Sequence, residues 1–307
     1  MKQESTSEIV ETAWRKGIVV PGFNIPYLPM MEPVVRALRD CNSVGLIMVA
    51  RLEWEKFESG SLRAVRDEYA KVKDENHTRL HLDHVPVIDE DNLQVDYMAI
   101  IAEALKLGYE SVMVDGSRLS LADNIAATKA IAQLAHEYGV PAEAELGAVM
   151  GHEAGPLPPY EELFTSKKGF TAPDEAKLFV EESGCDWLSV AIGNIHGAIS
   201  AAGKQKEKPR ARIDLEHLAQ LNDVAQVPLV LHGGTGIAPE YVQQGVKLGI
   251  AKINVATAIR QPYERLLPQG VAMAQEAVYQ TMIKLLRYEL NIENSAETLL
   301  KSNDEVK

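Results

Sequence analysis

The chain has 307 residues, of which 46% are hydrophobic and 24% are charged, a balance that is typical of a folded protein and excludes a disordered one. Its 31 lysines and arginines against 44 aspartates and glutamates give a formal net charge of −13. A chain this acidic will not bind nucleic acid or anionic membranes through its general field, so a polyanionic ligand would have to be held by a local site.

Short apolar runs alternate with longer amphipathic stretches along the chain. The apolar runs, which predict strands, cover 18–25, 44–50, 78–84, 110–116, 139–147, 186–193, 227–234 and 249–257. The amphipathic stretches, which predict helices, cover 30–41, 61–74, 96–108, 121–138, 173–183, 214–225, 238–248 and 262–288. Thr171 followed by Pro173 predicts a capped start for the helix at 173–183.

Eight strand–helix units in about 250 residues predict an α/β protein with the (β/α)8 TIM barrel fold. A doubly wound sheet is the alternative, but it rarely contains eight evenly spaced units. No linker rich in proline, glycine and serine divides the chain, so we expect a single domain over 1–307 with a C-terminal helical extension over about 262–307. The tail beyond residue 288 is open to three interpretations: a docking helix, an oligomer contact or a frayed end.

The cellular setting is predicted from what the chain lacks. The two cysteines, Cys41 and Cys185, allow neither a disulfide framework nor a cysteine-rich zinc site. No apolar run reaches membrane-spanning length, and the first 17 residues, MKQESTSEIVETAWRKG, do not resemble a signal or transit peptide. We therefore expect a cytoplasmic protein with no membrane partner.

Two connections are unusually long, at 148–170 and 197–213. Both follow predicted strands at their carboxyl ends, which form the catalytic face of a barrel. Loops of this length commonly bind ligands or close over them, and the alternative is a pair of surface loops without a function.

Nearly every predicted strand ends in a polar residue, which an apolar strand does not need for packing. These residues are Asn24, Asp83, His84, Asp115, Glu145, His196, His232 and Asn254. In a barrel they would converge on one mouth, and three neutral imidazoles with an open fourth position form a catalytic zinc site. The alternative for each histidine is a hydrogen-bonded core residue.

Asp83 and His84 are adjacent, so on a regular strand they would face opposite sides. We expect Asp83 to project into the mouth while His84, at the end of the strand, swings in from the loop. Asp83 would then suit general acid–base work, or alternatively would orient a histidine.

The segment His232-Gly-Gly-Thr-Gly236 leaves the seventh strand, and Asn254-Val-Ala-Thr257 closes the eighth. Backbone amides after these two strands are the recurrent phosphate cradle of the TIM barrel. One step below the mouth, His81, Glu143 and Lys252 form a layer that we expect to be structural, with glutamate and lysine neutralising each other.

Seven motifs resemble those of the class II, metal-dependent ketose-bisphosphate aldolases, the family of the fructose- and tagatose-bisphosphate enzymes. They are HLDH (81–84), SVMVDGS (111–117), AEAELG (142–147), FTAPDEA (170–176), VAIGNIHG (190–197), PLVLHGGTG (228–236) and KINVAT (252–257). They occur in order across most of residues 18–260.

The resemblance implies roles for residues of this chain. The positions that bind the family's catalytic Zn²⁺ fall on His84, His196 and His232, and those near a second, divalent or monovalent cation fall on Asp115 and Glu145. The acid–base group for the C4 hydroxyl falls on Asp83, and the loop acid that handles the proton on the dihydroxyacetone-phosphate carbon falls on Glu153. The substrate- and phosphate-binding positions fall on Asn24, Gly197, Gly233, Thr235, Asn254 and Thr257.

The departures from the family pattern concern the far end of the substrate. After His196 the family usually has a tyrosine and a lysine, where this chain has Ile199 and Ser200. Arg51 and Arg260 are candidates for a distal phosphate.

The resemblance therefore implies a zinc-dependent aldehyde-lyase that reversibly cleaves a phosphorylated ketose, with fructose 1,6-bisphosphate as the default substrate. Tagatose bisphosphate, another sugar phosphate, and a non-catalytic sugar-phosphate-binding paralogue remain alternatives. A metal-dependent barrel hydrolase usually carries an H-x-H pair on the first strand, which here ends Asn24-Ile-Pro26. The family resemblance also implies a homo-oligomer, either a dimer or a tetramer.

Overall fold

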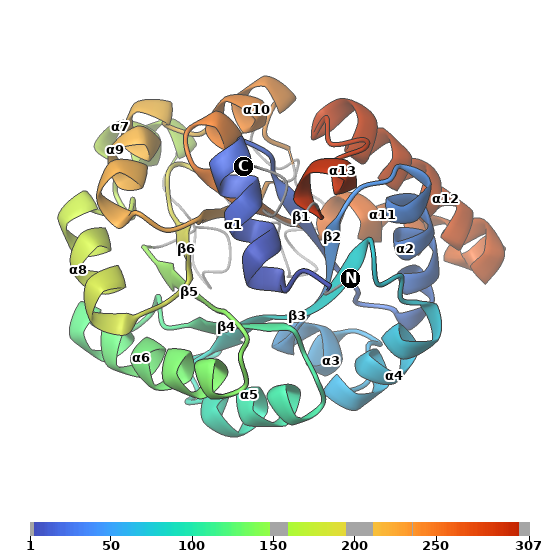
Figure 1. The fold of residues 1–307 in the computed structure, drawn as a ribbon, viewed down its shortest axis with the longest axis horizontal. Coiled ribbons are helices and arrows are strands. Elements are labelled where there is room, and N and C mark those ends of the chain that lie inside the picture. Colours follow the sequence, from blue (N-terminus) through green and yellow to red (C-terminus); the bar gives the residue numbers. More distant parts are fainter. Residues whose placement is uncertain (1–2, 148–158, 195–210, 235, 301–307) are drawn as a thin grey trace, which may run out of the picture.

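Eight parallel strands pair in the order of the chain and close into a barrel, with helices around it (Figure 1). The computed structural model describes residues 3–147, 159–194, 211–234 and 236–300. The strands are β1 (Val20–Asn24), β2 (Gly45–Ala50), β3 (Thr78–Pro86), β4 (Ser111–Asp115), β5 (Ala142–Leu146), β6 (Trp187–Val190), β7 (Leu229–Leu231) and β8 (Ile250–Val255). The predicted single-domain TIM barrel is confirmed.

The helices between the strands are also those that the sequence predicts. They are α2 (Met31–Asp40), α4 (Leu62–Val72), α5 (Tyr97–Lys106), α6 (Leu121–Glu137), α8 (Pro173–Ser183), α9 (Leu215–Ala225) and α10 (Pro239–Lys247). Their apolar faces pack on the outward side chains of the strands, such as Ile47, Leu82 and Val114, in one continuous core. Within the described residues, no helix has the length and apolar character required to cross a bilayer.

The helix α1 (Thr6–Lys16), which the sequence analysis did not predict, closes the amino-terminal end of the barrel (Figure 1). Its buried Ile9, Val10 and Ala13 belong to a second apolar cluster with the barrel residues Met48 and Trp187. A reciprocal pair of hydrogen bonds between Ser5 and Glu8 fixes where α1 begins. Among the described residues, apolar side chains fill this end of the barrel, and the polar interior residues lie toward the carboxyl ends of the strands.

Three other short elements were not predicted: α3 (Arg51–Lys56), α7 (Tyr160–Ser166) and the 3-10 turn η1 (Leu28–Met30), whereas α13 (Ala296–Leu299) lies within the expected C-terminal extension. Each is too short for its periodicity to be recognised. The helix α7 lies inside the connection that we expected to be a loop.

The predicted cap of α8 is wrong. Ala172, not Thr171, precedes the helix, and no side chain caps it. The Thr171 hydroxyl instead donates to the Leu146 carbonyl and accepts from the Ala191 amide, so it ties the end of β5 to the segment that follows β6.

The helical stretch predicted over 262–288 begins earlier and consists of more than one helix. The helix α11 (Thr257–Leu266) begins directly after β8, and α12 (Val271–Lys284) follows a 3-10 turn, η2 (Leu267–Gln269). Pro268 lacks the amide hydrogen that would continue α11, and Gly270 has a φ angle of 126°, which favours glycine. Beyond α12 the chain forms a π-helical turn, η3 (Leu285–Glu289).

Truncation of Ile9 tests the role of α1 as the floor of the barrel. Ile9 is fully buried. We expect Ile9→Ala to lower the free energy of unfolding by about 2–5 kcal/mol, because it leaves a cavity beneath the barrel. Leu178→Ala on α8, a side chain that is 45% exposed, is the matched control and should change it by less than about 0.5 kcal/mol. Equal urea midpoints for the two variants would contradict this role for α1.

Candidate metal and acid–base site

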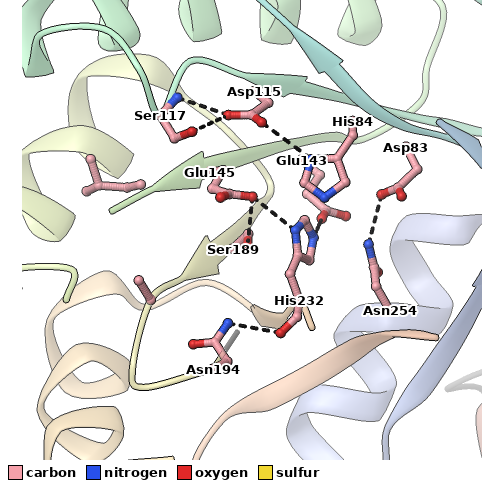
Figure 2. A network of polar contacts seen from close by, with 12 residues as sticks. Asp83, His84, Asp115, Ser117, Glu143, Glu145, Ser189, Asn194, His232 and Asn254 are labelled. Atoms are coloured by element: carbon pink, nitrogen blue, oxygen red, sulfur yellow. Dashed lines mark hydrogen bonds and ion pairs between the residues drawn. The ribbon is translucent and has the colours of Figure 1, made fainter. Parts of the chain in front are cut away.

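Polar side chains from separate strands meet inside the carboxyl-terminal end of the barrel (Figure 2). They face inward because every second residue of a barrel strand points to the interior. The predicted site residues that come together here are Asn24 of β1, Asp83 and His84 of β3, Asp115 of β4, Glu145 of β5, His232 after β7 and Asn254 of β8.

His84 enters the site through a bulge in β3. The pairing of β3 with β4 shifts register between Leu82 and Val85, and His84 has a left-handed φ angle of 36°. We expected His84 to swing in from a loop, but β3 continues to Pro86. The bulge therefore lets Asp83 and His84, although adjacent, both face the mouth of the barrel.

His84 and His232 form the centre of a cluster of metal-ligand atoms. Their ring centroids are 4.5 Å apart, His84 Nδ1 lies 3.4 Å from Asp115 Oδ2, and His232 Nδ1 lies 3.0 Å from Glu145 Oε2. Ligand atoms of Asp83, His84 and His232 all lie within 4.8 Å of one another, and so do those of His84, Asp115 and Glu145. Imidazole nitrogens beside carboxylate oxygens are a donor set that fits a divalent ion such as Zn²⁺.

The surrounding carboxylates hold His84 in its protonated form in the absence of a metal. Burial acts to lower the pKa of His84, but Asp83, the hydrogen bond to Asp115 and the charge of Glu145 outweigh it and raise this pKa to about 10. Conversely, desolvation acts to raise the pKa of the half-buried Asp115, but His84 and Ser117 hold that pKa well below its usual range. A metal ion binding here would have to displace the proton of His84.

The two nitrogens of His232 have different partners. Nε2 lies 2.9 Å from Glu143 Oε1, below the mouth, whereas Nδ1 faces Glu145. Burial and the charge of His84 act to lower the pKa of His232, but the hydrogen bonds to Glu143 and Glu145 raise it. Because Nε2 is bound to Glu143 below the mouth, Nδ1, on the side of Glu145, is the nitrogen that a metal at the mouth would bind.

Asp83 is held in a fixed orientation by two side-chain amides. Asn24 Nδ2 donates to Oδ2 over 2.9 Å, and Asn254 Nδ2 donates to Oδ1 over 2.8 Å. Burial acts to raise the pKa of Asp83, but the charges of His84 and Lys252 lower it below its usual value. Asp83 can therefore accept a proton at neutral pH, while its orientation is fixed on both sides.

The layer below the mouth consists of His81, Glu143 and Lys252, all fully buried. The expected pair is confirmed, with Lys252 Nζ 2.8 Å from Glu143 Oε2. The expectation of a purely structural layer is incomplete, because Glu143 also binds His232 and Lys252 also donates to Asn254 over 2.6 Å. His81 is neutral, since burial and the charge of Lys252 lower its pKa to about 3.

Glu53, which the sequence analysis did not single out, also reaches the site. Its carboxylate accepts from the Ala50 amide over 2.8 Å and from Asn24 Nδ2 over 3.4 Å, so it ties the start of α3 to the site. Burial raises the pKa of Glu53 to about 8. At a helix start, a glutamate three residues after the capping position commonly accepts a hydrogen bond from the backbone amide of that position. Glu53 stands in this relation to Ala50, and the spacing could have identified it.

The two arginines proposed for a distal phosphate are paired with carboxylates. Arg51 lies 2.9 Å from Glu55 and 3.4 Å from Asp89. Arg260 donates to both carboxylate oxygens of Glu264, over 2.8 and 2.9 Å. A phosphate at either position would compete with these partners, so their role stays a prediction.

The predicted phosphate-binding segment after β7 adopts a backbone conformation that favours glycine. Gly233 has a φ angle of 65°, and a Cβ on Gly234 would lie only 2.6 Å from Ile253 Cδ1. Thr257 begins α11, next to Asn254 at the end of β8. Several predicted residues lie outside the described part of the chain: His152, Glu153, His196, Gly197 and Thr235.

Comparison with known proteins relates the whole chain to one family. The family model described as "Fructose-bisphosphate aldolase class-II" matches residues 4–301. The YdjI aldolase of Escherichia coli K12 superposes with a TM-score of 0.73 at 24% identity, over 95% of this chain and 99% of that one. The fructose-bisphosphate aldolase of Campylobacter jejuni superposes with a TM-score of 0.68 at 18% identity, over 95% and 96%. At these identities the two structures show a shared fold.

Metal affinity is predicted to rise with pH. Because the pKa of metal-free His84 is raised to about 10, each bound ion must displace the proton of His84 throughout the neutral range. The Zn²⁺ association constant should therefore increase about tenfold per pH unit for each proton released, as competition with a chelator of known pH dependence would measure. Calorimetry in buffers of different ionisation enthalpy should show at least one proton released per ion. A constant affinity between pH 6 and 8 would contradict the protonation of His84.

Proposed function

The chain belongs to the class II fructose-bisphosphate aldolase family, and on this premise we propose that it is a zinc-dependent aldolase with fructose 1,6-bisphosphate as its substrate. The family makes it an aldehyde-lyase that acts on a phosphorylated sugar and generally requires a divalent metal. The products of the proposed reaction are dihydroxyacetone phosphate and glyceraldehyde 3-phosphate. A cytoplasmic location and a dimeric or tetrameric assembly stay predictions.

The observation that carries the proposal is the position of Asp83 beside the two imidazoles. An ionised carboxylate with both oxygens held by amides lies within ligand distance of His84 and His232. A ketose hydroxyl bound between Asp83 and the two imidazoles would contact both a proton acceptor and the site for a cation.

The resident metal would be held by His84 and His232, with His196 as the third predicted ligand. When bound, a divalent ion supplies Lewis-acid stabilisation of the negative charge that carbon–carbon cleavage leaves on the triose fragment. Asp115 and Glu145, which pair with the two imidazoles, would orient them and provide the predicted position for a second cation.

The side chains of the site account for the proton transfers of the reaction. Asp83 would take the proton of the C4 hydroxyl as the C3–C4 bond breaks, and would return it in the direction of synthesis. Asn24 and Asn254 keep both carboxylate oxygens in place, so the acceptor is oriented before the substrate binds. Glu153 is proposed, from the family pattern, to handle the proton on the dihydroxyacetone-phosphate carbon.

The remaining residues would bind the substrate, the glycines through their backbone amides. Gly233, Thr257 and Asn254 are proposed to hold the phosphate of the triose fragment, together with Gly197 and Thr235. This placement follows the usual phosphate position after the last two strands of a TIM barrel. Arg51 and Arg260 are the proposed contacts of a distal phosphate, for which they would have to exchange their present carboxylate partners.

A coupled assay for triose phosphate tests the proposed activity. The Zn²⁺-loaded protein should release triose phosphate from fructose 1,6-bisphosphate, and a chelator should abolish this release reversibly. Tagatose 1,6-bisphosphate and ketose monophosphates belong in the same panel, because a preference for one of them would keep the reaction and change the substrate. Binding of these sugars without release of triose phosphate would indicate a non-catalytic paralogue and contradict the proposal.

Removal of the Asp83 carboxylate separates proton transfer from metal binding. Asp83→Ala should retain the bound metal and lose turnover by roughly 10²–10⁴-fold, because the C4 proton has no acceptor. Asp174→Ala, at an exposed position in the first turn of α8, is the matched control and should retain full turnover. Metal content by elemental analysis and initial rates at saturating substrate give the two readouts. An Asp83→Ala protein with the turnover of the control would refute the assignment.

A further inference from the structure

Lys252 lies in the interior of the barrel with no exposure to water. Its Nζ is 2.8 Å from Glu143 Oε2 and 2.6 Å from Asn254 Oδ1. A buried ammonium is costly unless every donor finds an acceptor, and an ammonium can only donate. Both partners must therefore present an oxygen atom to Lys252, which restricts how each of them faces its next neighbour.

The first restriction acts on the predicted metal ligand His232. Because Glu143 Oε2 is held by Lys252, the other oxygen, Oε1, points to His232 Nε2, 2.9 Å away. A carboxylate oxygen accepts, so Nε2 carries a proton. A metal must then bind Nδ1, which faces the mouth of the barrel 3.0 Å from Glu145 Oε2 and has to release to solvent the proton that it donates to that carboxylate.

The second restriction acts on the acid–base group. An asparagine amide has one oxygen and one NH₂ group, and a flip exchanges them. Since Asn254 Oδ1 accepts from Lys252, Nδ2 faces Asp83 Oδ1 and donates to it over 2.8 Å. With the amide reversed, its oxygen would face the Asp83 carboxylate, and two acceptors would repel each other.

We propose that Lys252 is a positioning residue that sets the reactive orientation of both halves of the site, acting on His232 through Glu143 and on Asp83 through Asn254. Its effect on turnover depends on the proposed function, whereas its effect on His232 and on metal binding does not. A role limited to neutralising Glu143 would explain the ion pair but not the 2.6 Å contact with Asn254.

The test compares Lys252→Met with Arg79→Met. The guanidinium of Arg79 is also buried, but at the opposite end of the barrel, where it binds the backbone oxygens of Glu4 and Glu75. Both variants lose one buried cation, so loss of stability alone affects both. The readouts are the ring ¹⁵N signals of His232 in histidine-labelled protein, the Zn²⁺ affinity, and kcat and KM of the Zn²⁺-loaded enzyme.

We expect Lys252→Met to lose the Nε2-protonated signature of His232 and to bind Zn²⁺ about 10–100-fold more weakly, the usual effect of removing a group that orients a metal ligand. Its kcat should fall by a larger factor than its KM rises, because Asp83 loses its orientation while the phosphate contacts proposed for Gly233 and Thr257, apart from that of Asn254, remain. Arg79→Met should keep all of these values. Wild-type His232 signals, Zn²⁺ affinity and kcat in Lys252→Met would overturn the proposal.

A second variant keeps the proposal testable if Lys252→Met does not fold. Lys252→Gln retains an N–H donor without the charge, and it should keep part of the Zn²⁺ affinity that Lys252→Met loses. A folded Lys252→Gln with wild-type His232 signals and kcat would also overturn the proposal. If the wild-type protein cleaves no ketose phosphate, the proposed function fails, but the ¹⁵N signals and the Zn²⁺ affinity still decide the role of Lys252.

Discussion

The ion pair between Glu143 and Lys252 is the interaction on which the arrangement of the site depends. Both side chains are fully buried, so neither charge can be satisfied by water. One carboxylate oxygen of Glu143 contacts the ammonium of Lys252, and the other accepts from His232. The ammonium also donates to Asn254. Because these two buried charges must be paired, the hydrogen-bond directions of His232 and Asn254, which lie closer to the mouth of the barrel, are determined as well.

The barrel makes this arrangement possible by keeping water away from it. The helix α1 and the apolar cluster around Trp187 close the floor, so the charged layer lies between an apolar plug and a polar mouth. In such a medium, a misplaced donor or acceptor costs more than it would at the surface. The pKa values of neighbouring groups differ accordingly: burial and the charge of Lys252 lower the pKa of His81 to about 3, whereas the carboxylates around His84 raise its pKa to about 10.

The sequence was a good guide wherever one strand or helix contains the whole signal. The apolar runs predicted each strand of the barrel, and polar strand ends identified Asp83, His84, Asp115, Glu145, His232 and Asn254, which the structure brings together. What it missed depends on pairing between distant segments. The bulge that turns His84 inward is a property of the register of β3 against β4, and the partner of Glu143 is 89 residues away. Pro268 and Gly270, which separate α11 from α12, lie inside the amphipathic pattern that predicted one helical stretch over 262–288.

Anomalous diffraction at the zinc edge, from crystals of the Zn²⁺-loaded protein, tests the central claim most directly. We expect the strongest peak at the mouth of the barrel, with His84 and His232 as ligands at about 2.0–2.1 Å and with Nδ1 as the ligating atom of His232. Coordination of His232 through Nε2, or a strongest peak away from both imidazoles, would contradict that claim.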